Sequence, residues 1–268
     1  MKIIVCVKQV PDTGVKAAVK PDGTLDRASM AAIANPDDCA AVEAALQIKD
    51  RLPEARIMLL SMGPAQAIPM LRELMAMGAD EAVLVSAREF AGSDTFATSQ
   101  SIAAAIAHLG LERDDIILCG RQAIDGDTAQ VGPQIAEKLN LPQATYAVDI
   151  TPEAGAVTVK RLLDNGYTMV RVPTPCLITC VREMNTPRHM SIYGILDSLE
   201  KPVTILGYED LKDEPLIEAD TIGLKGSPTN IAKSFTPPAK SAGERLPGAE
   251  DEASRALIRR LTERHIIR

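Results

Sequence analysis

The sequence predicts an α/β fold with a doubly wound, mostly parallel sheet, because short apolar runs alternate with helical patterns along its first half. The runs are rich in β-branched residues and lack polar alternation, which is typical of strands covered on both faces. Strands that alternate with helices through short links favour parallel pairing. Strands are expected at 2–8, 56–61, 81–86 and 115–120, and helices at 37–50, 64–77, 93–109 and 128–139.

Turn residues indicate where these helices begin and end. Asn35 precedes Pro36, so the Asn35 side chain is expected to cap a helix whose first position is Pro36. Gly63 and Pro64 are expected to lead a strand end into the next helix, and Gly78 to end that helix with a left-handed residue. These turns follow the carboxyl ends of the strands, where open α/β sheets bind their ligands.

After residue 145 the pattern changes to strand-like runs joined by tight turns, which predicts antiparallel strands added to the parallel core. The strongest hairpin signal is "DNG" at 164–166, which lies between two apolar arms. The run at 175–181 is assigned to the same antiparallel set.

Two domains are expected: residues 1–200 as a nucleotide- or flavin-binding α/β domain, and residues 201–268 as an extended C-terminal arm with a helix. The arm is rich in Pro, Gly and Lys. The helix at its end has acids first and arginines last, which matches the helix dipole. Such an arm is expected to pack on a partner subunit, and a mobile terminus is the competing interpretation.

Charge and composition exclude several classes of function. The chain has a net charge of −7 and no basic footprint, so nucleic acid is not an expected partner. No apolar run approaches the ~20 residues that span a bilayer, and no signal sequence is recognised, so no membrane span and a cytoplasmic location are expected. The five cysteines show no C-x-x-C spacing, which argues against zinc and iron–sulfur sites. Cys6 and Cys119 are interpreted as small buried thiols.

A turn rich in glycine and acids, "GRQAIDGDTAQVG", joins the fourth strand to its helix. Gly120 allows a tight turn, and Gly126 allows a ligand to approach the backbone closely. Asp127 is expected to cap a helix beginning near Thr128, whose first N–H groups suit a phosphate, while Thr128 and Gln130 add neutral donors. An adenine nucleotide fits this arrangement. An ordinary capped loop is the alternative, since the phosphate-loop and G-x-G-x-x-G patterns are absent.

Ordered blocks along most of the chain resemble the beta (small) subunit of electron-transfer flavoproteins. They read "MKIIVCVKQVPDTG", "IANPDDCAAVEAAL", "LSMGPAQA", "AMGADEAVLVS", "GRQAIDGDTAQVGPQ" and "ITCVREMNTPRHMSIYGIL". The resemblance implies an adenine-nucleotide-binding, Rossmann-like fold. It also implies a heterodimer with a larger alpha subunit, which carries the redox-shuttling FAD.

The resemblance further implies which residues hold the nucleotide at the strand ends. They are Cys6, Val7, Asn35, Asp38, Met62, Gly63, Gly120, Gln122, Ala123, Asp125, Gly126, Asp127, Thr128, Gln130 and Val131. No side chain is expected to act as a catalytic acid, base or nucleophile, because flavin chemistry belongs to the cofactor.

Two motifs bear on which nucleotide is bound. "KQVPDTG" and "DGDTAQVGP" resemble the anaerobic, electron-bifurcating branch of the family, which implies FAD in this subunit. That FAD would accept a hydride from NADH and pass electrons to the alpha-subunit FAD and an acyl-CoA dehydrogenase, and to a low-potential acceptor, ferredoxin or flavodoxin. Housekeeping members hold structural AMP instead, and this alternative stays open. A nucleotide-binding sensor without electron transfer is a third possibility.

Residues 182–196 resemble the family's recognition loop for the dehydrogenase. The resemblance implies partner contacts by Asn185, Pro187, Arg188 and Ile192, with Ile192 as an exposed apolar anchor of the kind found at hot spots. The chain has Thr186 where the family usually has an acid, and "DSLEK" replaces the lysine run that usually follows. A dedicated dehydrogenase partner is therefore expected.

Overall fold

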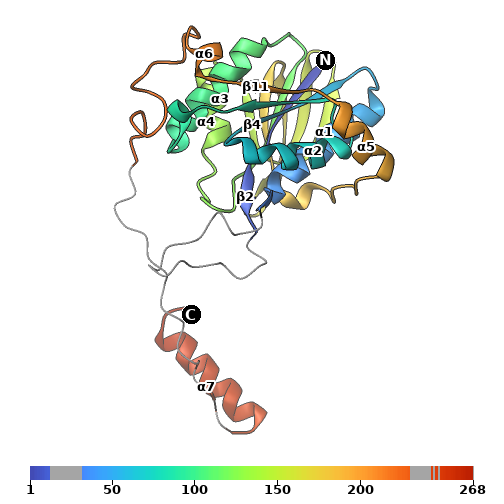
Figure 1. The fold of residues 1–268 in the computed structure, drawn as a ribbon. Helices are drawn as coiled ribbons and strands as arrows, with labels where there is room; N and C mark the ends of the chain where they lie inside the picture. Colours follow the sequence, from blue (N-terminus) through green and yellow to red (C-terminus); the bar gives the residue numbers. More distant parts are fainter. Residues whose placement is uncertain (13–31, 230–242, 244, 247, 268) are drawn as a thin grey trace. The chain divides into compact units, whose positions relative to one another are not determined.

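The computed structural model describes residues 1–12, 32–229, 243, 245–246 and 248–267 (Figure 1). The chain divides into two compact units, Met1–Ala232 and Lys233–Arg268. The first unit contains the sheet and the site described below.

Within the described residues, nine strands form one mixed sheet in the order β11-β5-β4-β1-β6-β10-β7-β8-β9. The strands from β11 to β7 pair in parallel, and β8 pairs antiparallel with both β7 and β9. This arrangement confirms the predicted α/β fold with a mostly parallel sheet. The bounds are β1 Lys2–Cys6, β4 Arg56–Met62, β5 Glu81–Val85, β6 Ile116–Gly120, β7 Gln143–Glu153, β8 Ala156–Leu163, β9 Gly166–Pro173, β10 Cys176–Cys180 and β11 Val203–Leu206.

Helices cover both faces of the sheet, as a doubly wound fold requires. Ile3 and Val5 of β1 belong to one apolar cluster with residues of α1 and α2, whereas Ile4 belongs to a second cluster with residues of α3 and α4. Burial on both faces explains why the strands lack polar alternation. The helix bounds are α1 Pro36–Arg51, α2 Ile68–Ala76, α3 Thr95–Leu109, α4 Val131–Lys138, α5 Ile192–Glu200 and α6 Tyr208–Leu211.

Two strands differ from the sequence expectation. β10 was expected to be antiparallel, but it pairs in parallel with both β6 and β7, since the chain returns to the core after the hairpin. β11 pairs in parallel with β5, so the sheet continues beyond residue 200 and the first unit extends to residue 232. The expected boundary at residue 200 is therefore too early, because a strand of only four residues gave no distinct signal in a polar stretch.

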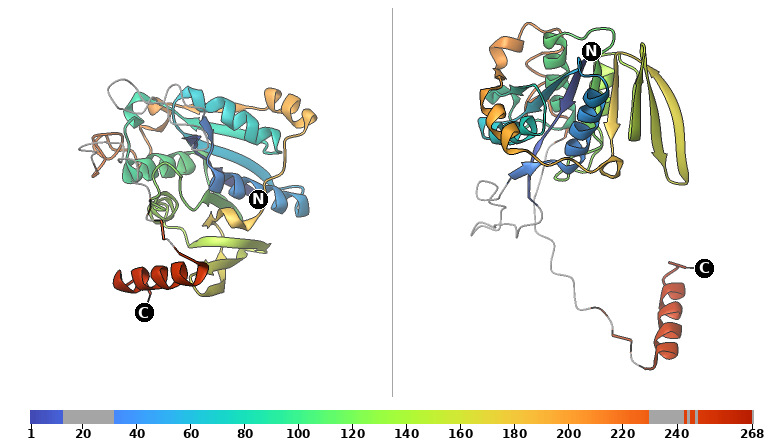
Figure 2. Two further views of the ribbon diagram at one scale, coloured as in Figure 1. Left: turned by 90° about the horizontal axis from the view of Figure 1, so that it is seen from below. Right: turned by 90° about the vertical axis from the view of Figure 1, so that its right-hand side faces the viewer.

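The predicted hairpin is confirmed and lies at one end of the sheet (Figure 2). Leu163 of β8 pairs with Gly166 of β9, and Gly166 has a φ of +145°, which favours glycine. A separate two-stranded antiparallel sheet is formed by β2, Gln9–Pro11, and β3, Ala32–Ala34, which follow β1 and precede α1.

The helix starts are partly as predicted. Pro36 is the first residue of α1, but the Asn35 side chain makes no capping hydrogen bond to that helix. A short 3₁₀ turn, Ala65–Ala67, precedes α2. α4 begins at Val131, not near Thr128, so Asp127 is not its cap. Ala129 has a left-handed φ of 53°, which is incompatible with the first turn of an α-helix that begins at Thr128.

The second unit contains α7, Glu250–Glu263, with Glu250, Asp251 and Glu252 in its first turn and Arg260 in its last. The presence of α7 confirms the predicted terminal helix, and its charges follow the predicted order. Most of the predicted extended arm, 230–242, lies outside the described residues. In the part of the chain that the structure describes, no helix has the length and apolar character needed to cross a membrane.

Candidate nucleotide-binding site

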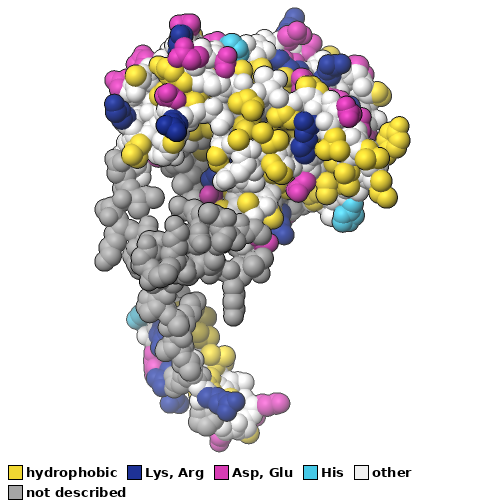
Figure 3. All heavy atoms as spheres, viewed as in Figure 1, with side chains coloured by type: hydrophobic (Ala, Val, Ile, Leu, Met, Phe, Trp, Pro, Cys, Tyr) yellow, Lys and Arg dark blue, Asp and Glu magenta, His cyan; other side chains and the backbone are white. Residues whose placement is uncertain are grey.

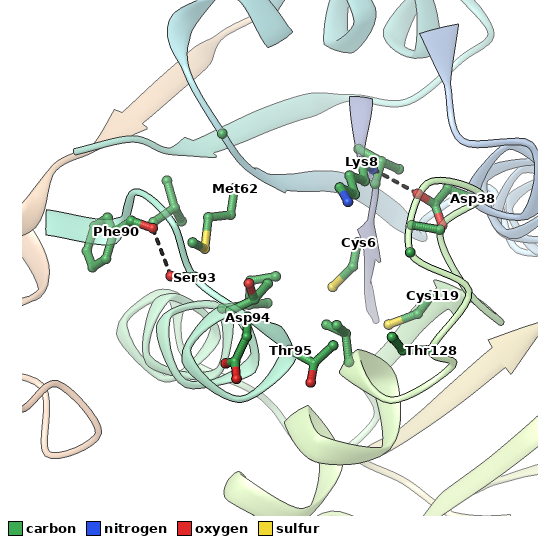
Figure 4. A pocket seen from close by; sticks show the side chains of 18 of the residues that line it. Cys6, Lys8, Asp38, Met62, Phe90, Ser93, Asp94, Thr95, Cys119 and Thr128 are labelled. Carbon is green, nitrogen blue, oxygen red and sulfur yellow. Dashed lines mark hydrogen bonds between the residues drawn. The ribbon is translucent and has the colours of Figure 1, made fainter. Parts of the chain in front are cut away.

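A cavity of about 920 Å³ lies at the carboxyl ends of β5, β4, β1 and β6 (Figure 4). The strand order reverses at β1, because β4 and β5 continue on one side of it and β6 lies on the other. Loops on the two sides of such a reversal diverge and leave a crevice, the usual ligand position in open α/β sheets. The first unit therefore has a ligand-sized cavity where its topology predicts one.

Most of the residues predicted to hold a nucleotide line this cavity, although they come from segments far apart in the sequence. Those lining it are Cys6, Val7, Asp38, Met62, Gly63, Gly120, Gln122, Ala123, Gly126, Thr128, Gln130 and Val131. The other three, Asn35, Asp125 and Asp127, do not line it. Their contacts hold the surrounding loops.

Asn35 fastens the loop after β6 to the start of α1. Its side chain is fully buried, its Nδ2 donates to the Gln122 carbonyl at 2.8 Å, and its Oδ1 accepts the Ile124 N–H at 3.1 Å. The amide thus satisfies two backbone groups of the loop instead of capping its own helix.

Asp38 joins the ends of β1 and β6. Its Oδ2 accepts the Lys8 N–H at 2.8 Å, and its Oδ1 accepts the Gly120 N–H at 3.1 Å. Burial raises the pKa of Asp38 to about 7, and these two hydrogen bonds oppose that rise because they favour the charged carboxylate. The same side chain therefore lines the cavity and fixes two of the strands around it.

The two acids of the turn are held by other side chains. Lys8 Nζ lies 2.8 Å from both carboxylate oxygens of Asp125, and Gln122 Nε2 donates to Asp127 Oδ1 at 2.7 Å. Lys8 and Gln122 line the cavity, whereas the two acids do not. Both carboxylates of the turn are therefore engaged by side chains that themselves line the cavity.

Two glycines of the turn have different roles. A Cβ on Gly120 would overlap Oδ1 of Asp38 and the backbone of Asp37. A Cβ on Gly126 would meet no protein atom within 4 Å, although Gly126 lines the cavity. Gly120 is required for packing of the loop against α1, while Gly126 leaves open space for a ligand.

Sequence reasoning missed the side of the cavity formed by the segment after β5. It identified turns after β1, β4 and β6 but not the fourth turn, whose lining residues include Ser86, Ala87 and Phe90. The signal was available, since β5 was predicted as a parallel strand and its carboxyl end must lie on the same sheet edge. Further unpredicted lining residues are Lys8, Pro64, Ala65, Val85, Arg88, Ala91, Gly92, Ser93, Asp94, Thr95, Thr98, Ile102, Cys119, Arg121, Ala129 and Gly132.

The start of α3 closes this side of the cavity. Asp94 caps α3 by accepting the Ala97 N–H at 3.1 Å. Thr95 Oγ1 lies 3.0 Å from Gln130 Oε1, which joins the start of α3 to the residue preceding α4. The β5 and β6 sides of the cavity are thus connected by a direct side-chain contact.

The predicted partner segment is fixed at one end and exposed at the other. Asn185 Nδ2 donates to the Ala40 carbonyl at 2.9 Å, and Arg188 pairs with Glu43 and Asp50 of α1. Pro187 between them is half-buried. Ile192, the first residue of α5, is 82% exposed. Other exposed apolar side chains around α5 form the patch visible in Figure 3: Met190, Tyr193, Ile195, Leu196 and Leu199.

No group of three or more His, Cys, Asp and Glu side chains in the described part of the chain is arranged to hold a metal ion. The cavity instead offers backbone groups, hydroxyls, amides and apolar side chains, together with charged side chains of both signs: Lys8, Arg88, Arg121, Asp38 and Asp94. This set suits an organic ligand with a polar and an apolar part.

Comparison with known proteins agrees with this fold. Residues 22–207 match the electron transfer flavoprotein domain. The chain is 60% identical over its full length to the full-length acryloyl-CoA reductase electron transfer subunit gamma of Anaerotignum propionicum. It is 48% identical to the caffeyl-CoA reductase-Etf complex subunit CarD of Acetobacterium woodii, again over 100% of both chains. An electron transfer flavoprotein subunit beta from Thermoanaerobacterium thermosaccharolyticum is 45% identical, also over 100% of both chains. The chain therefore belongs to the electron transfer flavoprotein family, as a subunit of the beta type.

Proposed function

We propose that this chain binds FAD in the cavity and that the FAD accepts a hydride from NADH. Electrons then pass to the alpha-subunit FAD and an acyl-CoA dehydrogenase or reductase, and to a low-potential acceptor such as ferredoxin or flavodoxin. The observation that carries the proposal is the size of the cavity, which extends from the end of β5 to the loop after β6.

The cavity is large for a mononucleotide. Its volume of about 920 Å³ is near the upper limit of the ~300–1,000 Å³ found for small-molecule sites. β4 and β1 lie between β5 and β6, so the two outer strands are about 14 Å apart at ~4.8 Å per strand. A dinucleotide such as FAD would use both sides of this space, whereas AMP would leave part of it empty.

The loop after β6 has the donors that a pyrophosphate needs. Gln130, the N-cap residue of α4, makes no side-chain capping hydrogen bond, so the N–H groups of Val131 and Gly132 are free to donate to an anion, while Pro133 has no N–H. Thr128 contributes a hydroxyl, and Lys8 contributes a positive charge beside the cavity. Because Lys8 and Gln122 engage the two acids of the turn, the carboxylates oppose a bound phosphate less than the sequence alone suggests.

The other side of the cavity is mainly apolar. Val85, Phe90 and Ile102 line it and are themselves buried, and Met62 packs against the same apolar cluster. Apolar walls exclude water from a planar ring and fix its position by contact. When bound, FAD supplies hydride acceptance and one-electron transfer, while the chain supplies position and a dry surrounding.

The patch around α5 is the proposed docking surface for the dehydrogenase or reductase. The segment before it is fixed on α1, and Arg72 of α2 donates to the carbonyl of Lys201 just after it at 2.7 Å. Rigid mounting lowers the entropy cost of association at an apolar anchor. Two relatives support this assignment, since they are named as subunits that work with acryloyl-CoA reductase and caffeyl-CoA reductase.

The proposal is tested by an anaerobic assay of the chain in complex with its alpha subunit and the cognate reductase. Ferredoxin reduction by NADH is expected only when the acyl-CoA acceptor is also present, because each hydride supplies one electron to each branch. Reduction of the acyl-CoA by NADH with no effect of ferredoxin would contradict the proposed division of electrons. The matched control is the same complex without NADH.

A further inference from the structure

Cys6 and Cys119 form a pair of thiols on the cavity wall. They occupy paired positions on the neighbouring parallel strands β1 and β6, so their side chains project from the same face of the sheet. Both line the cavity, with exposed fractions of 8% and 5%, and Figure 4 shows both sulfur atoms on the cavity side.

We infer that Cys6 and Cys119 constitute a dithiol site for trivalent arsenicals, which is accessible through the cavity and blocked when the cavity is filled. One arsenic atom bonds to both sulfur atoms: RAs(OH)₂ + 2 Cys–SH gives RAs(S–Cys)₂ + 2 H₂O. Two As–O bonds and two S–H bonds are replaced by two As–S bonds, and the protons leave in water. Arsenic remains trivalent, so the step needs no oxidant or reductant.

The geometry favours a bridging atom over a direct disulfide. Side chains at paired positions of parallel strands project side by side, so their Cβ atoms lie about one strand spacing apart, ~4.8 Å, whereas the Cβ atoms of a disulfide are ~3.8 Å apart. Paired cysteines on parallel strands would therefore have to pull the strands together to form an S–S bond. An arsenic atom between the two sulfur atoms spans a longer distance and leaves the ladder between β1 and β6 intact.

Thiols are soft ligands, so they bind a soft centre such as trivalent arsenic in preference to a hard cation such as Mg²⁺ or Ca²⁺. A protein metal site usually needs three or more ligands, and no such group occurs in the described residues. An organic arsenical with two exchangeable hydroxyls needs only two thiols. Cys6 and Cys119 supply the two sulfur atoms that such an arsenical needs.

The protonation state of the Cys119 thiol makes its expected reaction with an arsenical differ from its reaction with an alkylating reagent. The neighbouring Cys6 thiol, together with burial, raises the pKa of Cys119 well above its usual value. Alkylating reagents require the thiolate and should react slowly there. The arsenical releases its hydroxyls as water by taking up the thiol protons, so a protonated pair remains competent.

The other cysteines provide internal controls. Cys176 and Cys180 belong to the apolar cluster on the opposite face of the sheet, and burial raises the pKa of each to about 12. Cys39 lies on α1 and is only partly buried, so it is accessible as a single thiol. A single thiol forms one As–S bond, which a monothiol in the buffer exchanges away.

The test uses the full-length chain in complex with its alpha subunit, freed of nucleotide and treated with phenylarsine oxide in buffer containing excess monothiol. Intact mass spectrometry after gel filtration should show one retained adduct on this chain, which a small dithiol removes. Cys6→Ala and Cys119→Ala should each abolish the retained adduct, while Cys39→Ala should keep it. Circular dichroism identifies the folded variants, and the serine substitution replaces any alanine variant that does not fold. Retention of the adduct in folded variants of both cysteines, or no adduct on the folded parent, would overturn the inference.

A second experiment tests whether the dithiol lies in the cofactor site, and only this experiment rests on the proposed function. With free FAD at about 100 times its Kd, about 1% of the sites remain empty, so the rate of adduct formation should fall about 100-fold. An unchanged rate in a complex that demonstrably binds FAD would overturn the location of the dithiol in the cofactor site. If the complex binds no FAD, the proposed function fails, while adduct formation on the nucleotide-free complex still supports or overturns the dithiol itself.

Discussion

Gly120 and Asp38 fit together so closely that the Gly120 N–H donates to Asp38 Oδ1 at 3.1 Å, and a Cβ on Gly120 would overlap that oxygen. The two residues are 82 positions apart in the sequence. Their contact joins the end of β6 to the start of α1, beside β1. It therefore fixes the positions of two residues that line the cavity.

Gly120→Ala is expected to destabilise the fold. The added methyl group has to displace Asp38 or the backbone of Asp37, and overpacking of this kind typically costs about 1–3 kcal/mol of the free energy of unfolding. Urea unfolding followed by circular dichroism measures the loss. Gly126→Ala is the matched control, since its methyl group would meet no protein atom within 4 Å, and its unfolding midpoint should equal that of the parent. Equal midpoints for all three proteins would refute the packing role of Gly120.

The free energy of unfolding is expected to carry a pH dependence from Asp38. Burial raises the pKa of Asp38 to about 7 from the model-peptide value of 3.8. Between these values the folded state holds a proton that the unfolded state has released. Stability should therefore fall as the pH rises through this window, by up to about 1.4 kcal/mol per pH unit.

Asp38→Asn separates this contribution from those of other groups. The asparagine cannot ionise, so the difference in unfolding free energy between parent and variant should change between about pH 5 and about pH 8, with the parent losing more. Urea midpoints at the two pH values provide the measurement. A difference that stays constant across this range would show that Asp38 keeps the same charge in the folded and unfolded states.

Ala87→Leu tests whether a ligand occupies the β5 side of the cavity. Ala87 lines that side, and a leucine there would take up part of the space. FAD affinity should fall at least about tenfold, or ~1.4 kcal/mol, both in this variant and in Gly126→Ala on the β6 side. A mononucleotide occupies one side only, so AMP affinity should fall in just one of the two variants. Isothermal titration gives both affinities, and the account is wrong if FAD binds Ala87→Leu as tightly as the parent.

Ile192→Ala is expected to weaken the complex with the dehydrogenase or reductase. An exposed apolar side chain at a docking hot spot contributes about 2 kcal/mol or more, which corresponds to a Kd about 30-fold higher. Tyr167→Ala is the control, because Tyr167 is also exposed but belongs to β9 at the far end of the sheet. Surface plasmon resonance with the intact heterodimer measures both variants. Equal weakening by the two substitutions would argue against a docking surface at α5.

The core of the fold was predictable because its strands are apolar on both faces, a pattern that surface strands do not show. β11 was not predictable, since Val203–Leu206 is short and only Leu206 is buried. The role of Asn35 was also not predictable from local sequence. The residue lies at the expected helix start, yet its side chain binds the backbone of Gln122 and Ile124, which are 87 and 89 residues away in sequence. Local motifs indicate which turns form a site, whereas contacts of this kind depend on the assembled sheet.

Cofactor content tests the central claim most directly. The chain is co-expressed with its alpha subunit, the heterodimer is purified, and FAD and AMP released by denaturation are quantified per complex. The account predicts two FAD and no AMP, because the large cavity then holds a second flavin. One FAD with one AMP per heterodimer would contradict it and would leave the loop after β6 as the site of a structural nucleotide.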